Sequence, residues 1–306
     1  MSWNQKKIRG ILNLIDEDYK IVKNLPEEEQ AIMHKYIKRG REVSVEWLTV
    51  TGGGSLIFPG KNVILLLYYW IIGDPKLIPI FDFEYPAFIE NNVDYLVIYL
   101  TVYALIIYFG SYATCMYTAF TPLGPIFMMH CCSWLEIMEI RIGKLFDGDL
   151  KETEEKLKDI IKHLQHVYSL VEQILTSFRV IYECTLRGAI LLIPITFYEI
   201  IMAANKGEVP LEFISLIVGG VLVTSSPCYY SELLMSKGES LRQTMYSCGW
   251  ESVPDTKIRN MIRLVLVRAL RPCALRSLFK PICLETLAEV FQQSYAIFNV
   301  INSMWN

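Results

Sequence analysis

Five long apolar blocks, separated by strongly charged stretches, constrain this chain more than any other feature. A helix needs about 20 mostly apolar residues to cross the hydrocarbon of a bilayer, and five segments meet that length. They are 43–72, 93–120, 187–204, 211–234 and 282–304. Apolar residues make up 53% of the 306 residues, more than is usual in soluble domains. The sequence therefore predicts an all-α, polytopic helical membrane protein, built as a single domain over residues 1–306.

The distribution of lysine and arginine predicts how these helices are oriented. Of the 29 basic residues, nine lie in 1–42, seven in 121–185 and nine in 236–281, whereas the two loops on the opposite side hold only Lys76 and Lys206. Basic residues collect on the cytosolic side of membrane proteins. We therefore expect a cytosolic N-terminus, an extracellular C-terminus and two cytosolic anchor segments, 121–186 and 235–281.

The sequence lacks the common catalytic and nucleotide-binding motifs. It has no Walker loop, no Gly-x-Gly-x-x-Gly, no His-Glu-x-x-His and no Gly-x-Ser-x-Gly, and its net charge of −3 gives it no basic character. His163 and His166 have the spacing of a metal pair, but no carboxylate or cysteine stands at matching spacing, so a solvated or hydrogen-bonded pair is the simpler interpretation. We expect no enzyme activity, no cofactor, no metal and no nucleic-acid partner.

The segment 150–180 has apolar residues at helical spacing, with lysine and glutamate opposite them. The apolar stripe consists of Leu157, Ile160, Ile161, Leu164, Val167, Tyr168, Val171, Ile174, Leu175 and Phe178. No glycine or proline occurs from Leu150 to Arg187, so one helix is predicted to run from the cytosol into the third span. The stripe can pack within its own subunit or form a subunit interface, and the spacing does not choose between them.

The last apolar block differs from the others because one face is polar or small. That face is formed by Glu285, Glu289, Gln292, Ala296, Asn299 and Ser303, at spacings of three and four. Polar groups at membrane depth are costly unless they pair or line water. The face therefore either hydrogen-bonds inside a sealed bundle or lines a pore shared by several subunits. In the pore interpretation, Gln292, Asn299 and Ser303 line the channel, and Val300 and Met304 form an apolar gate.

Aromatic side chains gather in the outer half of the predicted bundle. The candidates for a ligand pocket are Tyr68, Tyr95, Tyr99, Tyr103 and Phe213. They can wall a site for a small apolar molecule, with tyrosine hydroxyls to orient it, or they can form an interfacial aromatic belt. Lys61 is a further candidate as a charge at membrane depth, unless it lies at a local break made by Pro59-Gly60. Gly52-Gly53-Gly54 predicts a close helix approach or a bend.

The C-terminal third of the sequence resembles the insect odorant receptors. Within Ser240–Trp250, Tyr246 and Trp250 have the family's Tyr-x-x-x-Trp spacing. Arg268–Pro272, followed by Leu284–Leu287 and Phe291, is similar to the family's cytosolic helix and the start of its last span. Ser294–Val300 is similar to the family's terminal Ser/Thr-Tyr-x-x-Phe signature. Upstream, Pro79, Pro86, His166, Glu172 and Phe178 also match. Thr244 and Ala296 are mild departures from the family pattern.

This resemblance implies an odorant receptor in the plasma membrane of olfactory sensory neurons. It implies a ligand-specific subunit of an odorant-gated, nonselective cation channel that forms a heterotetramer with a shared co-receptor. Subunits of the family meet through cytosolic helices, the last helix lines the pore, and a volatile odorant binds in the outer half of the bundle, surrounded by membrane lipid. Family members have seven spans, so we expect the first two to be missing here, an even number that preserves the orientation.

Two alternatives within the chemoreceptors stay open, a gustatory receptor subunit and a non-functional truncated receptor fragment. Gustatory receptors carry a Gln-Phe pair after their terminal Thr-Tyr, whereas Tyr295 here is followed by Ala-Ile-Phe-Asn. A G-protein-coupled receptor is disfavoured because Asp-Arg-Tyr and Asn-Pro-x-x-Tyr do not occur. A transporter is disfavoured because the sequence shows no internal symmetry.

Overall fold

The computed structural model describes residues 2–73, 96–207, 209–277 and 280–305. Its elements are α1 (Ser2–Val22), α2 (Glu27–Ile72), α4 (Leu96–Phe120), α5 (Leu123–Gly143), α6 (Leu150–Asn205), α7 (Leu211–Ser247), the 3-10 turn η1 (Trp250–Ser252), α8 (Thr256–Ala269) and α9 (Leu284–Trp305). In these ranges the one extended pairing is an isolated bridge between Arg276 and Pro281. The predicted all-α class is confirmed.

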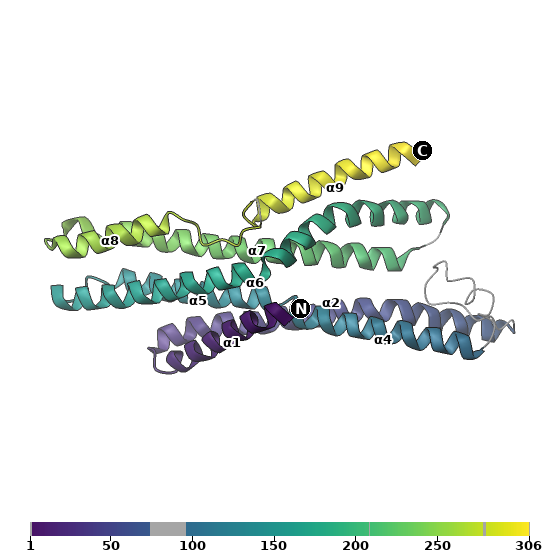
Figure 1. Cartoon of the computed structure of the whole chain (residues 1–306), viewed down its shortest axis with the longest axis horizontal. Helices are drawn as coiled ribbons and strands as arrows, with labels where there is room; N and C mark the ends of the chain where they lie inside the picture. The colour runs from purple at the N-terminus through teal and green to yellow at the C-terminus, as the bar shows by residue number, and fades with distance from the viewer. Residues whose placement is uncertain (1, 74–95, 208, 278–279, 306) are drawn as a thin grey trace.

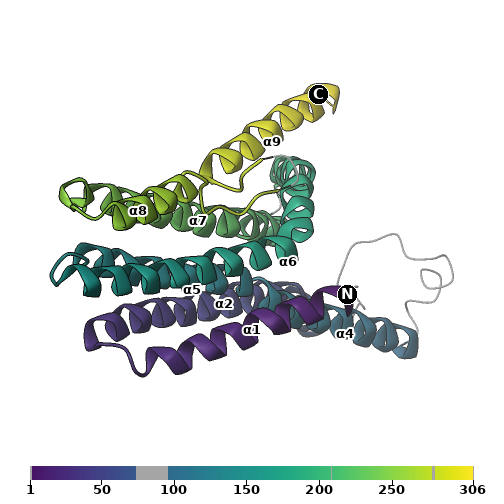
Figure 2. The same ribbon diagram turned by 60° about the vertical axis from the view of Figure 1, so that its left-hand side comes forward.

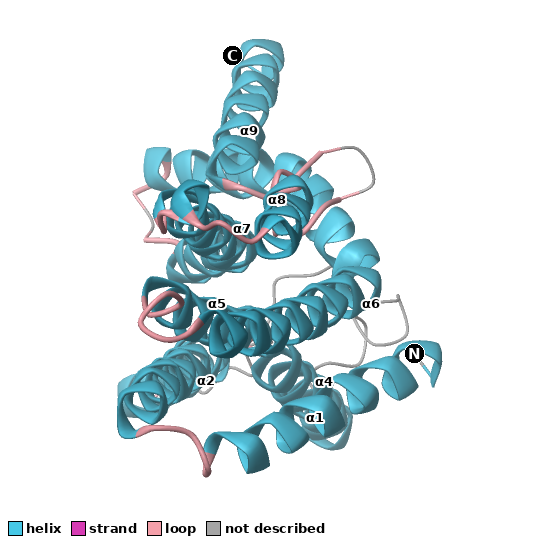
Figure 3. Ribbon diagram, turned by 90° about the vertical axis from the view of Figure 1, so that its left-hand side faces the viewer, coloured by secondary structure: helices cyan, strands magenta, loops and turns pink. Residues whose placement is uncertain are grey.

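The helices form an elongated molecule with two different halves (Figure 1). In one half, α5 packs against α2, α6 and α7, and α1 and α8 lie on the outside. In the other half, the end of α2 pairs with α4, the end of α6 pairs with the start of α7, and α9 leaves the bundle alongside α6. Figures 2 and 3 show the same arrangement from two further sides, with α9 projecting to the C-terminus. From the charge distribution in the sequence, we expect the half around α5 to be cytosolic, and we call it the cytosolic half.

Four helical stretches among the described residues are long and apolar enough to cross a membrane. They are Glu27–Ile72, Leu96–Gly143, Leu150–Asn205 and Leu211–Ser252, and they contain the first four predicted blocks apart from residues 93–95, which lie outside the described residues. Helix α9 forms as predicted but is not among the four, because its polar face lowers its mean hydropathy. The fifth crossing therefore stays a prediction.

Helix α5 is the centre of the cytosolic half. Phe127, Met128, Leu135, Ile137 and Met138 along it are at most 1% exposed, on every side of the helix. Full burial of such side chains stabilises a fold by about 1.5–3 kcal/mol each. The neighbouring Cys131 and Cys132 are also completely buried. All the long cytosolic helices are therefore positioned by one shared core.

The predicted continuous helix is confirmed by α6, which runs from Leu150 to Asn205 without a break. Its apolar stripe is buried within the chain itself: Leu157, Ile160 and Leu164 are at most 2% exposed, and Val167 and Ile174 are fully buried. The stripe faces the core formed with α5. Of the two interpretations, the structure supports packing within the subunit.

Helix α2 is continuous across the glycines and the proline in its sequence. It continues through Gly52–Gly54 and Pro59 to Ile72, so the alternative that Lys61 lies at a local break made by Pro59-Gly60 does not hold. A proline removes one backbone donor, and membrane helices tolerate this loss because nearby groups compensate. Of the two alternatives for the three glycines, a close helix approach does not occur within this chain, since a Cβ atom at any of them would meet nothing within 4 Å. The alternative of a bend stays a prediction.

A close approach does occur where α5 begins. A Cβ atom on Gly124 would lie 1.7 Å from the hydroxyl oxygen of Tyr182 on α6, and the ring of Tyr182 stacks on Phe178 with centroids 5.6 Å apart. The hydroxyl is buried and Phe178 is 3% exposed, so the ring has little space to move. Only glycine fits at this contact.

Replacing Gly124 with alanine should lower the free energy of unfolding by about 1–3 kcal/mol, because the added methyl group overpacks the contact. Thermal unfolding of the purified chain measures this loss. The variant Gly124→Ala/Tyr182→Phe should recover much of it, since the clashing oxygen is removed, whereas Gly143→Ala, which meets nothing within 4 Å, is the control. Equal losses with and without Tyr182→Phe would contradict this contact.

Helix α1 is held to the bundle by a buried carboxylate. Asp18 is 3% exposed, and Nε2 of His130 on α5 lies 2.8 Å from its Oδ2 atom. Nε2 of His166 on α6 lies 3.0 Å from Oδ1, and the indole N–H of Trp134 donates to Oδ2 at 3.2 Å. Burial raises the pKa of this carboxyl, but the hydrogen bonds and charges of His130 and His166 outweigh burial and hold the pKa below its ordinary value. His166 therefore helps to hold α1 against α6.

Asp18→Ala should release α1 from the bundle, because it leaves His130 and Trp134 buried without their partner. Removing one partner of a buried ion pair typically lowers the free energy of unfolding by about 3 kcal/mol. Amide hydrogen exchange in α1 measures the release, and Asp16→Ala, an exposed acid on the same helix, is the control. Because the folded-state pKa of Asp18 is lowered, its contribution is complete above the ordinary carboxyl pKa near 4 and is lost as the pH falls below it. Unchanged protection of α1 in Asp18→Ala would contradict this role.

Candidate ligand site and pore face

The two membrane hairpins are joined by an ion pair in their outer half. Nζ of Lys61 on α2 contacts a carboxylate oxygen of Glu212 at the start of α7, and their side chains are 47% and 18% exposed. Opposite charges at membrane depth stabilise one another because neither is well solvated there. Lys61, which the sequence indicates as a functional candidate, therefore connects the α2–α4 hairpin to the α6–α7 hairpin.

Next to this ion pair, α2 and α4 share a buried polar contact. The hydroxyl of Tyr99 donates to Oδ1 of Asn62 at 3.4 Å, and the two residues are 8% and 3% exposed. The ring of Tyr103, one turn further along α4, lies 5.9 Å from that of Tyr99. This places an aromatic pair, a hydroxyl, an amide and an ion pair within neighbouring turns of the outer half. Such a set can orient a small apolar molecule that carries one polar group.

The structure brings together some of the predicted pocket residues. Tyr99 and Tyr103 are adjacent, and Phe213 is half-buried directly after the paired Glu212. Tyr68 is 57% exposed, and its ring lies edge-on to Tyr69 on the same helix, so it is not part of this group. Tyr95 lies outside the described residues. The ligand roles of all five remain predictions.

Sequence reasoning missed two members of the group, Asn62 and Glu212. The available signal was the one that singled out Lys61, a polar side chain inside or beside an apolar block. Asn62 follows Lys61 directly, and Glu212 is the second residue of the fourth block. Nothing in the sequence indicates that Glu212 meets Lys61, because 151 residues separate them.

Helix α9 presents its predicted pore residues on one exposed face. Gln292, Asn299, Val300, Ser303 and Met304 are all exposed, with Val300 at 57% and Met304 at 76%. The opposite face packs on α6 and α7: Val290 and Ser294 are buried, and the ring of Phe298 lies 5.2 Å from that of Phe197. Gln292, Asn299 and Ser303 therefore face away from the chain's own bundle, whereas Glu289 pairs with Lys280 within the chain at 2.7 Å. The exposure of the first three disfavours the sealed-bundle interpretation for a single subunit.

A carboxylate on α5 ties the cytosolic helices that carry these membrane segments. Glu136 accepts a hydrogen bond from Tyr36 on α2 at 2.6 Å and pairs with Lys35 at 3.2 Å and with Lys237 on α7 at 2.7 Å. Arg141, also on α5, donates through Nη2 to Glu29 at 2.7 Å. Each of these contacts fixes the rotation of a helix that continues into the membrane half.

Comparisons with known proteins define the class. The model of the family described as 7tm Odorant receptor matches residues 1–295. The structure of the insect olfactory receptor OR5 from Machilis hrabei has a similar fold, with a TM-score of 0.69 and 15% identity over 97% of this chain and 74% of that one; the values are the same for its complex with eugenol. Fold, apolar helices and family match together define a multi-pass membrane protein of the chemoreceptor type.

This chain belongs to the 7tm odorant receptor family. It is also similar to odorant receptor 10a of Drosophila melanogaster, with 21% identity over 211 residues. That alignment covers 66% of this chain and 52% of the relative, so the chain spans about half the length of the curated relative that it matches. The resemblance seen in the C-terminal motifs is confirmed.

Reversing the charges of Lys61 and Glu212, singly and together, tests the ion pair between them. Lys61→Glu places two acids side by side and should lower the melting temperature of the purified receptor by several degrees, corresponding to about 1–2 kcal/mol. Lys61→Glu/Glu212→Lys should restore most of the loss, because the pair is re-formed in reverse. Melting temperatures that are equal in the single and the exchanged variant would contradict the contact.

Proposed function

We propose that this chain is an odorant receptor subunit of an odorant-gated, nonselective cation channel. In this proposal it assembles with the shared co-receptor as a heterotetramer in the plasma membrane of olfactory sensory neurons. The exposed polar face of α9 is the observation that carries the proposal, since a helix with such a face needs water or partner subunits beside it. Membership of the odorant receptor family supports the same assignment.

The pore in this proposal is formed by the α9 helices of several subunits around an axis. Gln292, Asn299 and Ser303 line it, and Val300 with Met304 forms the narrow apolar ring that closes it. All five side chains are exposed in the single chain, so they are available to such a ring without rearranging the bundle. The proposal requires α9 to cross the membrane as a fifth span with an extracellular C-terminus.

The ligand in this proposal is a volatile odorant that binds between the hairpins in the outer half. Tyr99 and Tyr103 supply aromatic surface, and Asn62 and the Lys61–Glu212 pair supply polar groups. A ligand that contacts both hairpins can bias the position of α6, and α9 packs along α6. A bound odorant therefore has a direct mechanical route to the pore helix.

Whole-cell current in cells that express this chain with the co-receptor tests the proposal. A panel of volatiles should evoke an inward current that disappears when this chain is omitted. Met304→Ala should raise the current in the absence of odorant several-fold, because a smaller apolar ring dewets less readily. Met202→Ala, an exposed methionine on α6, is the matched control and should leave that current unchanged.

Two outcomes would contradict the proposal. Silence with every volatile, although the chain reaches the cell surface with the co-receptor, would favour a non-functional fragment. An evoked current that Met304→Ala and Val300→Ala both leave unchanged, with and without odorant, would show that α9 does not contain the gate.

A further inference from the structure

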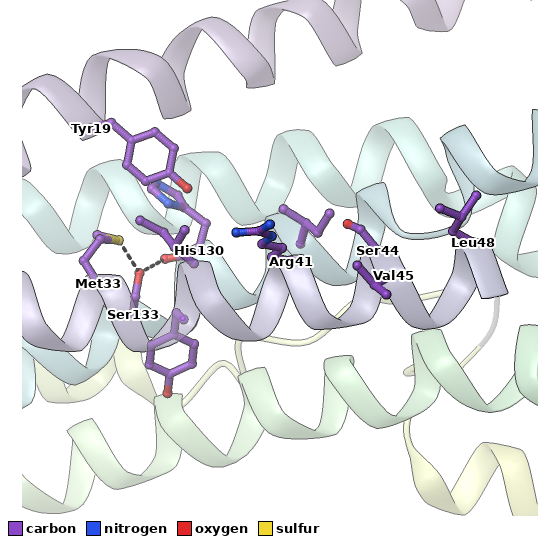
Figure 4. Close-up of a pocket in the computed structure, with 11 residues that line it drawn as sticks. Tyr19, Met33, Arg41, Ser44, Val45, Leu48, His130 and Ser133 are labelled. Carbon is purple, nitrogen blue, oxygen red and sulfur yellow. Dashed lines mark hydrogen bonds between the residues drawn. The ribbon is translucent and has the colours of Figure 1, made fainter. Parts of the chain in front are cut away.

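A cavity lies at the junction of the two halves, between α1, α2 and α5. Its volume is about 450 Å³, within the range of about 300–1,000 Å³ that is usual for ligand pockets. Figure 4 shows Tyr19 and His130 at one end and Arg41, Ser44, Val45 and Leu48 following one another along α2. The cavity is separate from the odorant region proposed above and from α9.

One end of this cavity is polar and cationic. Within the described part of the chain, the guanidinium of Arg41 has no hydrogen bond or ion pair, whereas Arg141 and Lys237 both pair with carboxylates. His130 is 4% exposed, and its Nδ1 atom has no hydrogen-bond partner among the described residues. A buried nitrogen without a protein partner is unusual, and a water molecule or a bound polar group beside it would satisfy it.

The other end of the cavity is apolar and faces the membrane. Val45 and Leu48 are 53% and 57% exposed, and Ile126 of α5 lines the same side. Arg41 lies two residues before the first predicted span, 43–72, with Glu42 between them, so in the predicted topology the cationic end lies at the inner membrane boundary and the apolar end lies inside it. Lys38 and Arg39 add positive charge on the cytosolic side.

We propose that this cavity binds one anionic phospholipid of the inner leaflet. The lipid phosphate would lie at Arg41, whose planar guanidinium matches phosphate geometry, and one acyl chain would lie along Val45 and Leu48. The headgroup end would reach toward His130 and Tyr19, which belong to the region where α1 is held. Bound lipid would thus join α1, α2 and α5 at the membrane boundary.

Photo-crosslinking of the full chain in phosphatidylcholine nanodiscs tests the proposal. The nanodiscs contain a small amount of one of two photoreactive probes, phosphatidylserine or phosphatidylcholine with a diazirine on its acyl chain. After irradiation, the labelled peptide is identified by mass spectrometry. The peptide with Val45 and Leu48 should be labelled about five-fold more by the phosphatidylserine probe, as expected for one basic side chain at the surface. Arg41→Gln should abolish this preference, and Lys38→Gln, an exposed base outside the cavity, should preserve it.

Val45→Trp provides a second variant, because it fills the apolar end and should reduce labelling by both probes several-fold. The proposal is overturned if the two probes label this peptide equally, or if Arg41→Gln keeps the preference. It is also overturned if neither probe labels the peptide and a photoreactive residue at position 45 crosslinks only to protein, since a protein segment would then occupy the cavity.

Discussion

The burial of α5 is the constraint on which the rest of the structure depends. This helix is apolar on all sides, so it is stable only when α2, α6 and α7 surround it, and those same helices continue into the membrane half. Its few charged residues, among them Glu136 and Arg141, each meet a partner on another helix and fix how that helix is rotated. The cytosolic bundle thereby determines where every membrane hairpin begins and which face it turns toward its neighbours.

In the membrane half, different interactions determine how the helices are arranged. Lipid is as apolar as leucine, so helices there gain little from burying apolar side chains against one another, and small numbers of polar contacts decide the arrangement. The contacts between Lys61 and Glu212, between Tyr99 and Asn62, and between the hydroxyls of Thr51 and Thr118 at 2.6 Å are of this kind. Among the described residues this half has few strong contacts and few buried side chains, so it is the half in which a ligand can most easily shift helix positions.

Periodicity and length predicted the features that depend on local sequence. The blocks that became α2, α4, α6 and α7, the continuity of α6 and its buried stripe follow from spacing that is visible in the sequence. Contacts between residues far apart in the sequence were not predictable. Asp18 and His130 are separated by 112 residues, and Lys61 and Glu212 by 151. The sequence left open whether α2 continues through Pro59, because a membrane helix tolerates a proline that would break a soluble one.

The central claim, that the exposed face of α9 lines water in the assembled receptor, is tested most directly by cysteine accessibility. Single cysteines at positions 299 and 303 should react with a charged, membrane-impermeant thiol reagent added from outside and should block the current. Cysteines at Ile297 and Ile301, which are partly buried on the same helix, should stay unmodified. Equal reactivity at all four positions, or reaction only at 297 and 301, would contradict the account.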